Sequence, residues 1–147
     1  MKAKTLTCTA ALIAASCFAV TPAIAAGAAN SGGLPAAHEQ GAISYLSGGI
    51  GKNEAQAIKH VAQQYPLELD FLRKARPKDE YLSDVKVVVT DMHNMKVLDV
   101  KSDGPYLLAK LPAGKYAITA DHDGKVEHRM VQIAEHKHRR IVFEWNA

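Results

Sequence analysis

The fold class of this chain is decided by the segment Leu111-Pro112-Ala113-Gly114-Lys115-Tyr116-Ala117-Ile118-Thr119-Ala120-Asp121-His122-Asp123-Gly124. Every second residue of 116–120 is apolar or aromatic, which is typical of a strand with one buried face. Pro112 and Gly114 suit the second and fourth positions of a type I turn. Asp121-His122-Asp123-Gly124 carries the residues of a second chain reversal. The segment therefore predicts one strand of an antiparallel sheet, bounded by tight turns.

Similar short strands are predicted on both sides of this segment, with a turn signal about every ten residues. They cover residues 43–47, 67–71, 85–90, 97–100, 106–111, 126–133 and 140–145, and the first of them is expected at a sheet edge. This spacing favours a mainly β fold, an antiparallel β-sandwich of about seven strands, because a βαβ fold would need helices between the strands.

One amphipathic helix is predicted over residues 53–65, where the apolar residues follow a helical period. Asn53 is expected to be its N-cap, with Gln56 completing a capping box. Pro66 ends it, because the residue before a proline disfavours the helical conformation. We expect this helix to pack on one end or edge of the sandwich.

The N-terminus has the pattern of a cleavable signal peptide over residues 1–25. Lys2 and Lys4 precede an uncharged apolar stretch, and Ala23-Ile24-Ala25 supplies the small residues of a cleavage site before Ala26. The apolar stretch is too short for a good membrane span, although an uncleaved anchor and lipidation of Cys17 remain alternatives. We expect a periplasmic protein, not embedded in the membrane after cleavage, with a flexible leader at 26–42 and a single domain at 43–147 whose sandwich covers about 67–146.

Removal of this signal would change the chemistry of the chain. Both cysteines, Cys8 and Cys17, lie within it, so the mature chain would have no thiol. The full chain has 18 Lys plus Arg residues and 15 Asp plus Glu residues. Cleavage would remove Lys2 and Lys4 but no acidic residue, so positive and negative side chains would nearly balance. A nearly neutral domain lacks the electrostatic footprint of a nucleic-acid-binding protein.

Residues 81–145 resemble the carboxypeptidase regulatory-like, or transthyretin-like (prealbumin-like), β-sandwich family, as found in small exported proteobacterial proteins. The resemblance is carried by the strand at 85–89, by Ser102-Asp103-Gly104-Pro105-Tyr106 and above all by Leu111-Pro112-Ala113-Gly114-Lys115-Tyr116. It implies a fold and an accessory or binding role rather than an activity. The chain has no His-x-x-Glu zinc motif, and its end, Glu144-Trp145-Asn146-Ala147, differs from the Tyr-Arg-Gly-Ser tail of the hydrolases of that fold.

Two histidine clusters are the candidate metal ligands, because neutral imidazole suits Zn, Cu or Ni. They consist of Asp121, His122 and Asp123, and of His136 and His138. The alternative for the first is ordinary turn chemistry, and for the second a solvated loop. We expect no cofactor.

Two further features have both a functional and a structural explanation. Four aromatic residues would form either a sugar-stacking platform or, as we favour, part of the core: Tyr106, Tyr116, Phe143 and Trp145. The basic run at 137–140 would attract an anionic partner or form a solvated loop. No catalytic residue is indicated, since the mature chain lacks a cysteine nucleophile and a Gly-x-Ser-x-Gly motif.

The sequence therefore predicts an exported, non-enzymatic β-sandwich module that binds a protein partner or an envelope component. A carbohydrate- or metal-binding module is the first alternative, and an enzyme with a spatially assembled site is the second.

Overall fold

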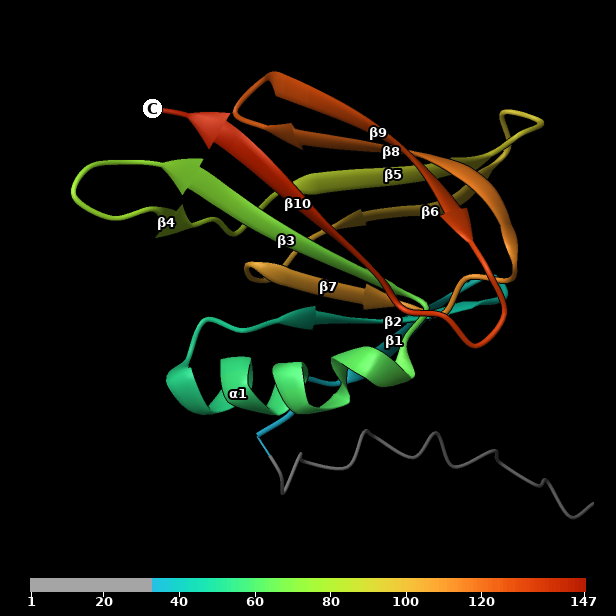
Figure 1. Cartoon of the computed structure of the whole chain (residues 1–147), viewed down its shortest axis with the longest axis horizontal. Coiled ribbons are helices and arrows are strands. Elements are labelled where there is room, and N and C mark those ends of the chain that lie inside the picture. Colours follow the sequence, from blue (N-terminus) through green and yellow to red (C-terminus); the bar gives the residue numbers. More distant parts are fainter. Residues whose placement is uncertain (1–32) are drawn as a thin grey trace, which may run out of the picture.

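The computed structural model describes residues 33–147, which form two stacked β-sheets and one helix (Figure 1). In sheet A the strand order is β1, β2, β7, β3, β10, with β4 paired to β3. In sheet B it is β6, β5, β8, β9. The strands of sheet A are β1 (Ala37–Gln40), β2 (Ile43–Gly48), β7 (Tyr106–Ala109), β3 (Leu67–Lys74), β10 (Arg139–Asn146) and β4 (Glu80–Tyr81). Sheet B contains β6 (Lys96–Lys101), β5 (Lys86–Asp91), β8 (Gly114–His122) and β9 (Lys125–Ile133). Helix α1 (Lys52–Val61) continues into a 3-10 turn, η1 (Ala62–Gln64).

The predicted mainly β sandwich with one short helix is confirmed for the described residues, with ten strands rather than about seven. Every strand pair in this part of the chain is antiparallel except β3 with β10, which is parallel. The chain leaves β3, builds sheet B and β7, and returns to sheet A as β10. A parallel pair requires such a long crossover, and no local sequence signal reveals it.

The predicted flexible leader is wrong for its last residues, because Ala37–Gln40 form β1. β1 pairs with β2, so the segment expected to be an edge strand lies inside sheet A, between β1 and β7. All of β1 is exposed, which explains the lack of apolar alternation there. The Gln40 amide also exchanges two hydrogen bonds with the backbone of Asp99, at 3.1 and 2.6 Å, and so covers the edge of β6. Residues 1–25, predicted to be the signal peptide, and 26–32 lie outside the described residues.

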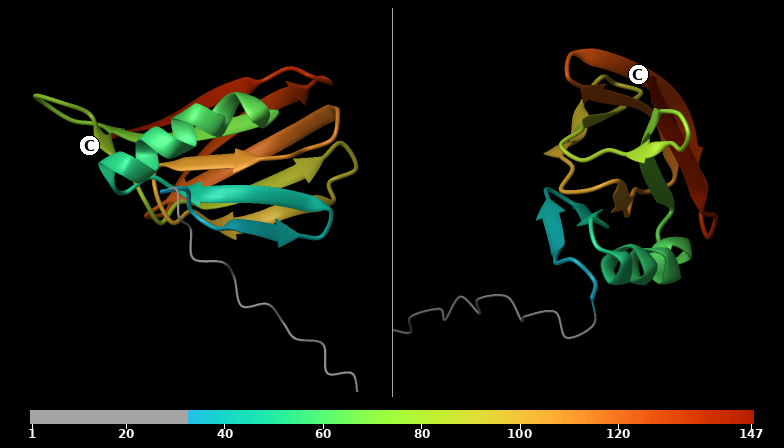
Figure 2. Two further views of the ribbon diagram at one scale, coloured as in Figure 1. Left: turned by 90° about the horizontal axis from the view of Figure 1, so that it is seen from below. Right: turned by 90° about the vertical axis from the view of Figure 1, so that its left-hand side faces the viewer.

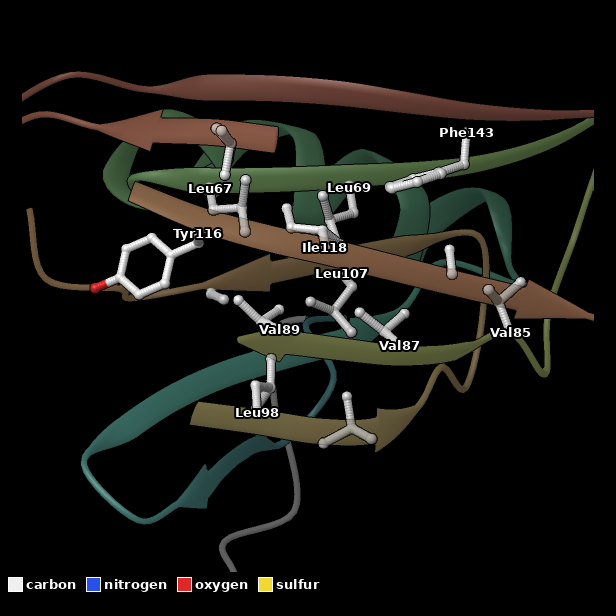
Figure 3. Close-up of a cluster of buried hydrophobic side chains, with 14 of the residues drawn as sticks. Leu67, Leu69, Val85, Val87, Val89, Leu98, Leu107, Tyr116, Ile118 and Phe143 are labelled. Atoms are coloured by element: carbon white, nitrogen blue, oxygen red, sulfur yellow. The ribbon is translucent and has the colours of Figure 1, made fainter. Parts of the chain in front are cut away.

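The main core lies between the two sheets and follows the period of two in the sequence (Figure 3). Leu67 and Leu69 of β3 point inward with Val87 of β5 and Ile118 of β8, and all four side chains are fully buried. The Tyr116 ring closes one end of this core, where its hydroxyl donates a 2.9 Å hydrogen bond to the Pro112 carbonyl.

A second, smaller core lies between α1 and the outer face of sheet A (Figure 2). Ile58 of the helix is fully buried there and belongs to one cluster with Leu46, Tyr106 and Leu108. β7 is therefore buried on both faces, which explains why its residues form a continuous apolar run without alternation. The helix covers a sheet face rather than an end of the sandwich.

The helix boundaries agree with the prediction, but the predicted cap is wrong. The N-cap is Gly51, without a side-chain cap, and Asn53 lies inside the first turn of α1. The Glu54 carboxylate instead accepts a 2.9 Å hydrogen bond from the backbone N–H of Gly49. Gly49 has φ +101°, a conformation that favours glycine, so the glycine-rich segment before the helix has a defined structure.

A close backbone approach fixes this end of sheet A. A Cβ at Gly104 would lie 2.4 Å from the Gly48 carbonyl, with no flexible side chain to move away. We expect Gly104→Ala to lower the free energy of unfolding by about 2 kcal/mol. Gly51→Ser is the matched control, since position 51 has no neighbouring atom within 4 Å and serine suits an N-cap. Urea unfolding measures both, and equal stabilities would show that the Gly48–Gly104 contact does not constrain the fold.

Candidate functional site

Two acidic side chains are buried on the outer face of β3, beside the helix. Glu68 is 6% exposed and Asp70 is 1% exposed. Strand alternation places them there, because Leu67 and Leu69 point into the main core. Such carboxylates are rarely buried without positively charged or hydrogen-bonding partners.

The partners come from the other end of the chain, at the beginning of β10. His138 Nε2 lies 2.8 Å from Glu68 Oε2, and His138 Nδ1 lies 2.8 Å from the Tyr65 carbonyl oxygen. Arg140 donates from Nε to Asp70 Oδ2 at 2.9 Å and also from a terminal nitrogen to the same oxygen. Arg140 Nε is 3.8 Å from Glu68 Oε1, so the two acids and two bases form one connected network.

The electrostatics of this network are dominated by burial. Burial raises the pKa of Asp70, whereas the hydrogen bond and charge of Arg140 oppose this and the Glu68 charge adds to it. Asp70 in turn raises the pKa of Arg140. Asp70 Oδ1 is buried and has no hydrogen-bond partner within the described residues. Burial, chiefly, also raises the pKa of the neighbouring Tyr106, with contributions from Tyr81 and Asp70.

The hydrogen bonds of His138 limit what its ring can do. The Tyr65 carbonyl can only accept, so Nδ1 must carry a proton. Nε2 faces the Glu68 carboxyl, so both ring nitrogens are engaged by oxygen atoms of the protein. Neither nitrogen is left to face a substrate.

Two adjoining clefts open beside this network. One, of about 460 Å³, is lined by Lys59, Ala62, Gln63, Glu68, His138 and Arg140. The other, of about 730 Å³, lies between η1, the β7–β8 turn and the β9–β10 turn. Gln63 borders both, and we call them together the basic cleft. Lys59 Nζ lies 5.5 Å above the Tyr106 ring at one side.

The first predicted metal cluster lies in the β8–β9 hairpin turn. Asp121 Oδ1 accepts a 3.0 Å hydrogen bond from the Gly124 N–H, and Asp123 has φ +51°, as expected for turn chemistry. His122 Nε2 lies 3.4 Å from Asp123 Oδ2, and the His122 ring packs 5.9 Å from that of Trp145.

The second predicted metal cluster does not converge on one point. His138 binds Glu68 and the Tyr65 carbonyl, while His136 has φ +57° in the β9–β10 turn. The two clusters lie at opposite ends of β10. Across residues 33–147, no group of three or more His, Cys, Asp or Glu residues is placed to hold a metal ion.

The four aromatic residues considered as a sugar platform are buried, as favoured from the sequence. Their exposed fractions are at most 7%: Tyr106, Tyr116, Phe143 and Trp145. The basic run at 137–140 is not simply a solvated loop, because two of its members, His138 and Arg140, bind buried acids.

Sequence reasoning missed Glu68 and Asp70 as site residues. Their alternation with Leu67, Leu69 and Phe71 predicts a strand with a solvated polar face. Only the parallel pairing with β10 shows that this face is covered.

Comparisons with known proteins leave the family open. No family model matches the chain, and none of the curated proteins matches its sequence. One solved structure that matches part of this chain is the TIE protein of Bacillus anthracis, at 14% identity and a TM-score of 0.39, over 55% of this chain and 16% of that protein. No helix within the described residues is long and apolar enough to cross a membrane.

The Arg140–Asp70 pair gives a pH-dependent prediction. Arg140→Met should lower the free energy of unfolding by about 2 kcal/mol at neutral pH, because it leaves a buried carboxylate unpaired. Loss of Arg140 also lets the pKa of Asp70 rise further, because the cost of burying an unpaired carboxylate applies only to its ionised form. Arg140→Met should therefore be less stable than the unmodified chain at pH values above the folded-state pKa of Asp70. This difference in the free energy of unfolding should shrink as the pH falls towards about 4.

Chemical unfolding of the unmodified chain and of Arg140→Met across this pH range measures the difference in their free energies of unfolding. Glu68, His138 and Lys59 face the same cleft and are present in both proteins. Arg139→Met, on the exposed neighbouring residue, is the control and should have little effect. A deficit of equal size for both variants, or one independent of pH, would contradict the network.

Proposed function

We propose that this chain is an exported, non-enzymatic β-sandwich module that binds an acidic segment of a protein partner in the basic cleft. The observation that carries the proposal is the charge of that cleft. Lys59, Lys137 and Arg140 reach its surface and outnumber its one exposed acid, Glu135, while Glu68 and Asp70 are buried beneath and already paired. The surface offered to a ligand is therefore positive, although the chain as a whole carries little net charge.

The shape and apolar lining of the cleft support a peptide rather than a flat lipid surface. Its larger part contains the apolar side chains of Tyr65, Pro66, Leu111, Pro112 and Ile133. A concave surface that combines apolar walls with a few polar groups is typical of ligand sites. An extended segment with both acidic and apolar side chains would match both properties.

The same geometry favours binding over catalysis. Both ring nitrogens of His138 are engaged, and the residues that line the two clefts include no Ser, Thr or Cys nucleophile. The carbohydrate alternative loses its main support, because the aromatic side chains that would stack on a sugar are buried.

Site-specific crosslinking in intact cells tests the proposal. A photoreactive residue at Gln63, inside the basic cleft, should capture a protein, and the captured peptide should be acidic. The same residue at Gln132, exposed on β9 of sheet B, should not. A lipid or glycan adduct at position 63, or equal protein capture at both positions, would overturn the assignment.

Charge reversal at the rim gives an independent test. Lys59→Glu combined with Lys137→Glu should lower the yield at position 63 about tenfold, since each exposed ion pair contributes up to about 1 kcal/mol. Lys86→Glu combined with Lys115→Glu reverses two exposed charges on sheet B and should leave the yield unchanged. Equal losses for the two double variants would show that only net charge matters.

The export part of the proposal rests on the pattern of residues 1–25. Mass spectrometry of the protein from the envelope fraction should find its N-terminus at Ala26 or within a few residues. An intact Met1 in that fraction would contradict cleavage.

A further inference from the structure

All three methionines of the described residues are exposed. Met92, Met95 and Met130 have exposed fractions of 58%, 65% and 66%. Methionine is usually buried, where its flexible side chain fills gaps in a core. These three thioethers therefore do not contribute to the packing of the sandwich. Two of them lie on either side of His93, in the turn that joins β5 and β6.

Hydrogen bonds from the backbone and from the Asp91 side chain hold this turn in one shape. Asp91 Oδ1 accepts from the N–H groups of His93 and Met95 at 2.8 and 3.0 Å. The Asp91 carbonyl accepts from the Asn94 N–H at 3.1 Å, and the Asp91 N–H donates to the Met95 carbonyl at 3.0 Å. Asn94 has φ +58°, which suits a three-residue hairpin loop. The turn projects from the body of the molecule in Figure 1.

The side chains of this turn provide soft donors. Met92 and Met95 carry thioethers and His93 carries an imidazole, all in a four-residue stretch. The only carboxylate of the turn, Asp91, accepts both backbone N–H groups through Oδ1 and in this way holds the turn in shape. Thioether and imidazole donors favour Cu(I), whereas Mg²⁺, Ca²⁺ and Mn²⁺ prefer oxygen ligands. We propose that the β5–β6 turn binds a soft monovalent cation, Cu(I), through Met92, His93 and Met95.

Met130 provides an internal control for the same chemistry. It is as exposed as the other two methionines but lies on β9, without a second thioether in its strand. The nearest histidine along this strand, His128, already lies 3.0 Å from the Thr119 hydroxyl through Nδ1. A specific site in the turn should therefore discriminate between Met92 or Met95 and Met130, whereas general thioether affinity should not.

Ag(I) is the probe, because it is a soft monovalent cation like Cu(I) and is not oxidised in air. The full chain is used with Cys8→Ser and Cys17→Ser, since thiolates would otherwise compete for the ion. With methyl-labelled methionine, one equivalent of Ag(I) should shift the NMR signals of Met92 and Met95 together and leave that of Met130 unchanged. No shift, or an equal shift of all three, overturns the proposal.

Substitutions identify the ligands by affinity. Met92→Leu, Met95→Leu and His93→Asn should each weaken Ag(I) binding at least tenfold, whereas Met130→Leu should not change it. Leucine is close to methionine in volume and all these positions are exposed, so folding is not at risk. An excess of Mg²⁺ should leave the Ag(I) affinity unchanged. An equal effect of Met130→Leu, or displacement of Ag(I) by Mg²⁺, contradicts a soft-metal site in the turn.

Discussion

Burial of two carboxylates on β3 is the constraint on which sheet A depends. Glu68 and Asp70 lose water on folding, and such charges must be paired or neutralised. The pairing comes from β10 in one register only, with Arg140 opposite Glu68. A slip by one residue would turn Arg140 towards the core and bring Ile141 to the outer face. The charge network therefore selects the register of a parallel pair whose strands are far apart in sequence.

The helix and this network divide the outer face of sheet A between them. α1 covers β2 and β7 through Ile58, and η1 ends before β3 begins. The outer face of β3 is then covered by Arg140 from β10 and by His138, which immediately precedes β10. The basic cleft lies along this junction, because the helix and β10 approach each other without meeting.

The sequence predicted those parts of the fold that depend on local patterns. Alternation in residues 85–90 and 116–120 located β5 and β8 of sheet B, and the helical period with Pro66 located the helix. It missed β1, which has no buried face, and the parallel β3–β10 pair, which depends on long-range pairing. The candidate site was missed for the same reason. Glu68 has the pattern of a solvated residue until β10 lies beside it, while His138 was predicted to be a metal ligand or part of a solvated loop. The resemblance to a transthyretin-like family remains a prediction.

The network also determines how the basic cleft would bind. Its walls come from η1, β3, β10 and the β7–β8 and β9–β10 turns, and the contacts of His138 and Arg140 with Tyr65 and Asp70 hold part of this surface in place without a ligand. A preorganised surface loses little conformational entropy on binding, so a modest number of contacts suffices for measurable affinity. In the proposed binding mode, the buried charges stabilise the fold, whereas the exposed Lys59 and Lys137 would contact the ligand. Because the two groups are separate side chains, substitution at the rim can change binding while leaving the fold intact.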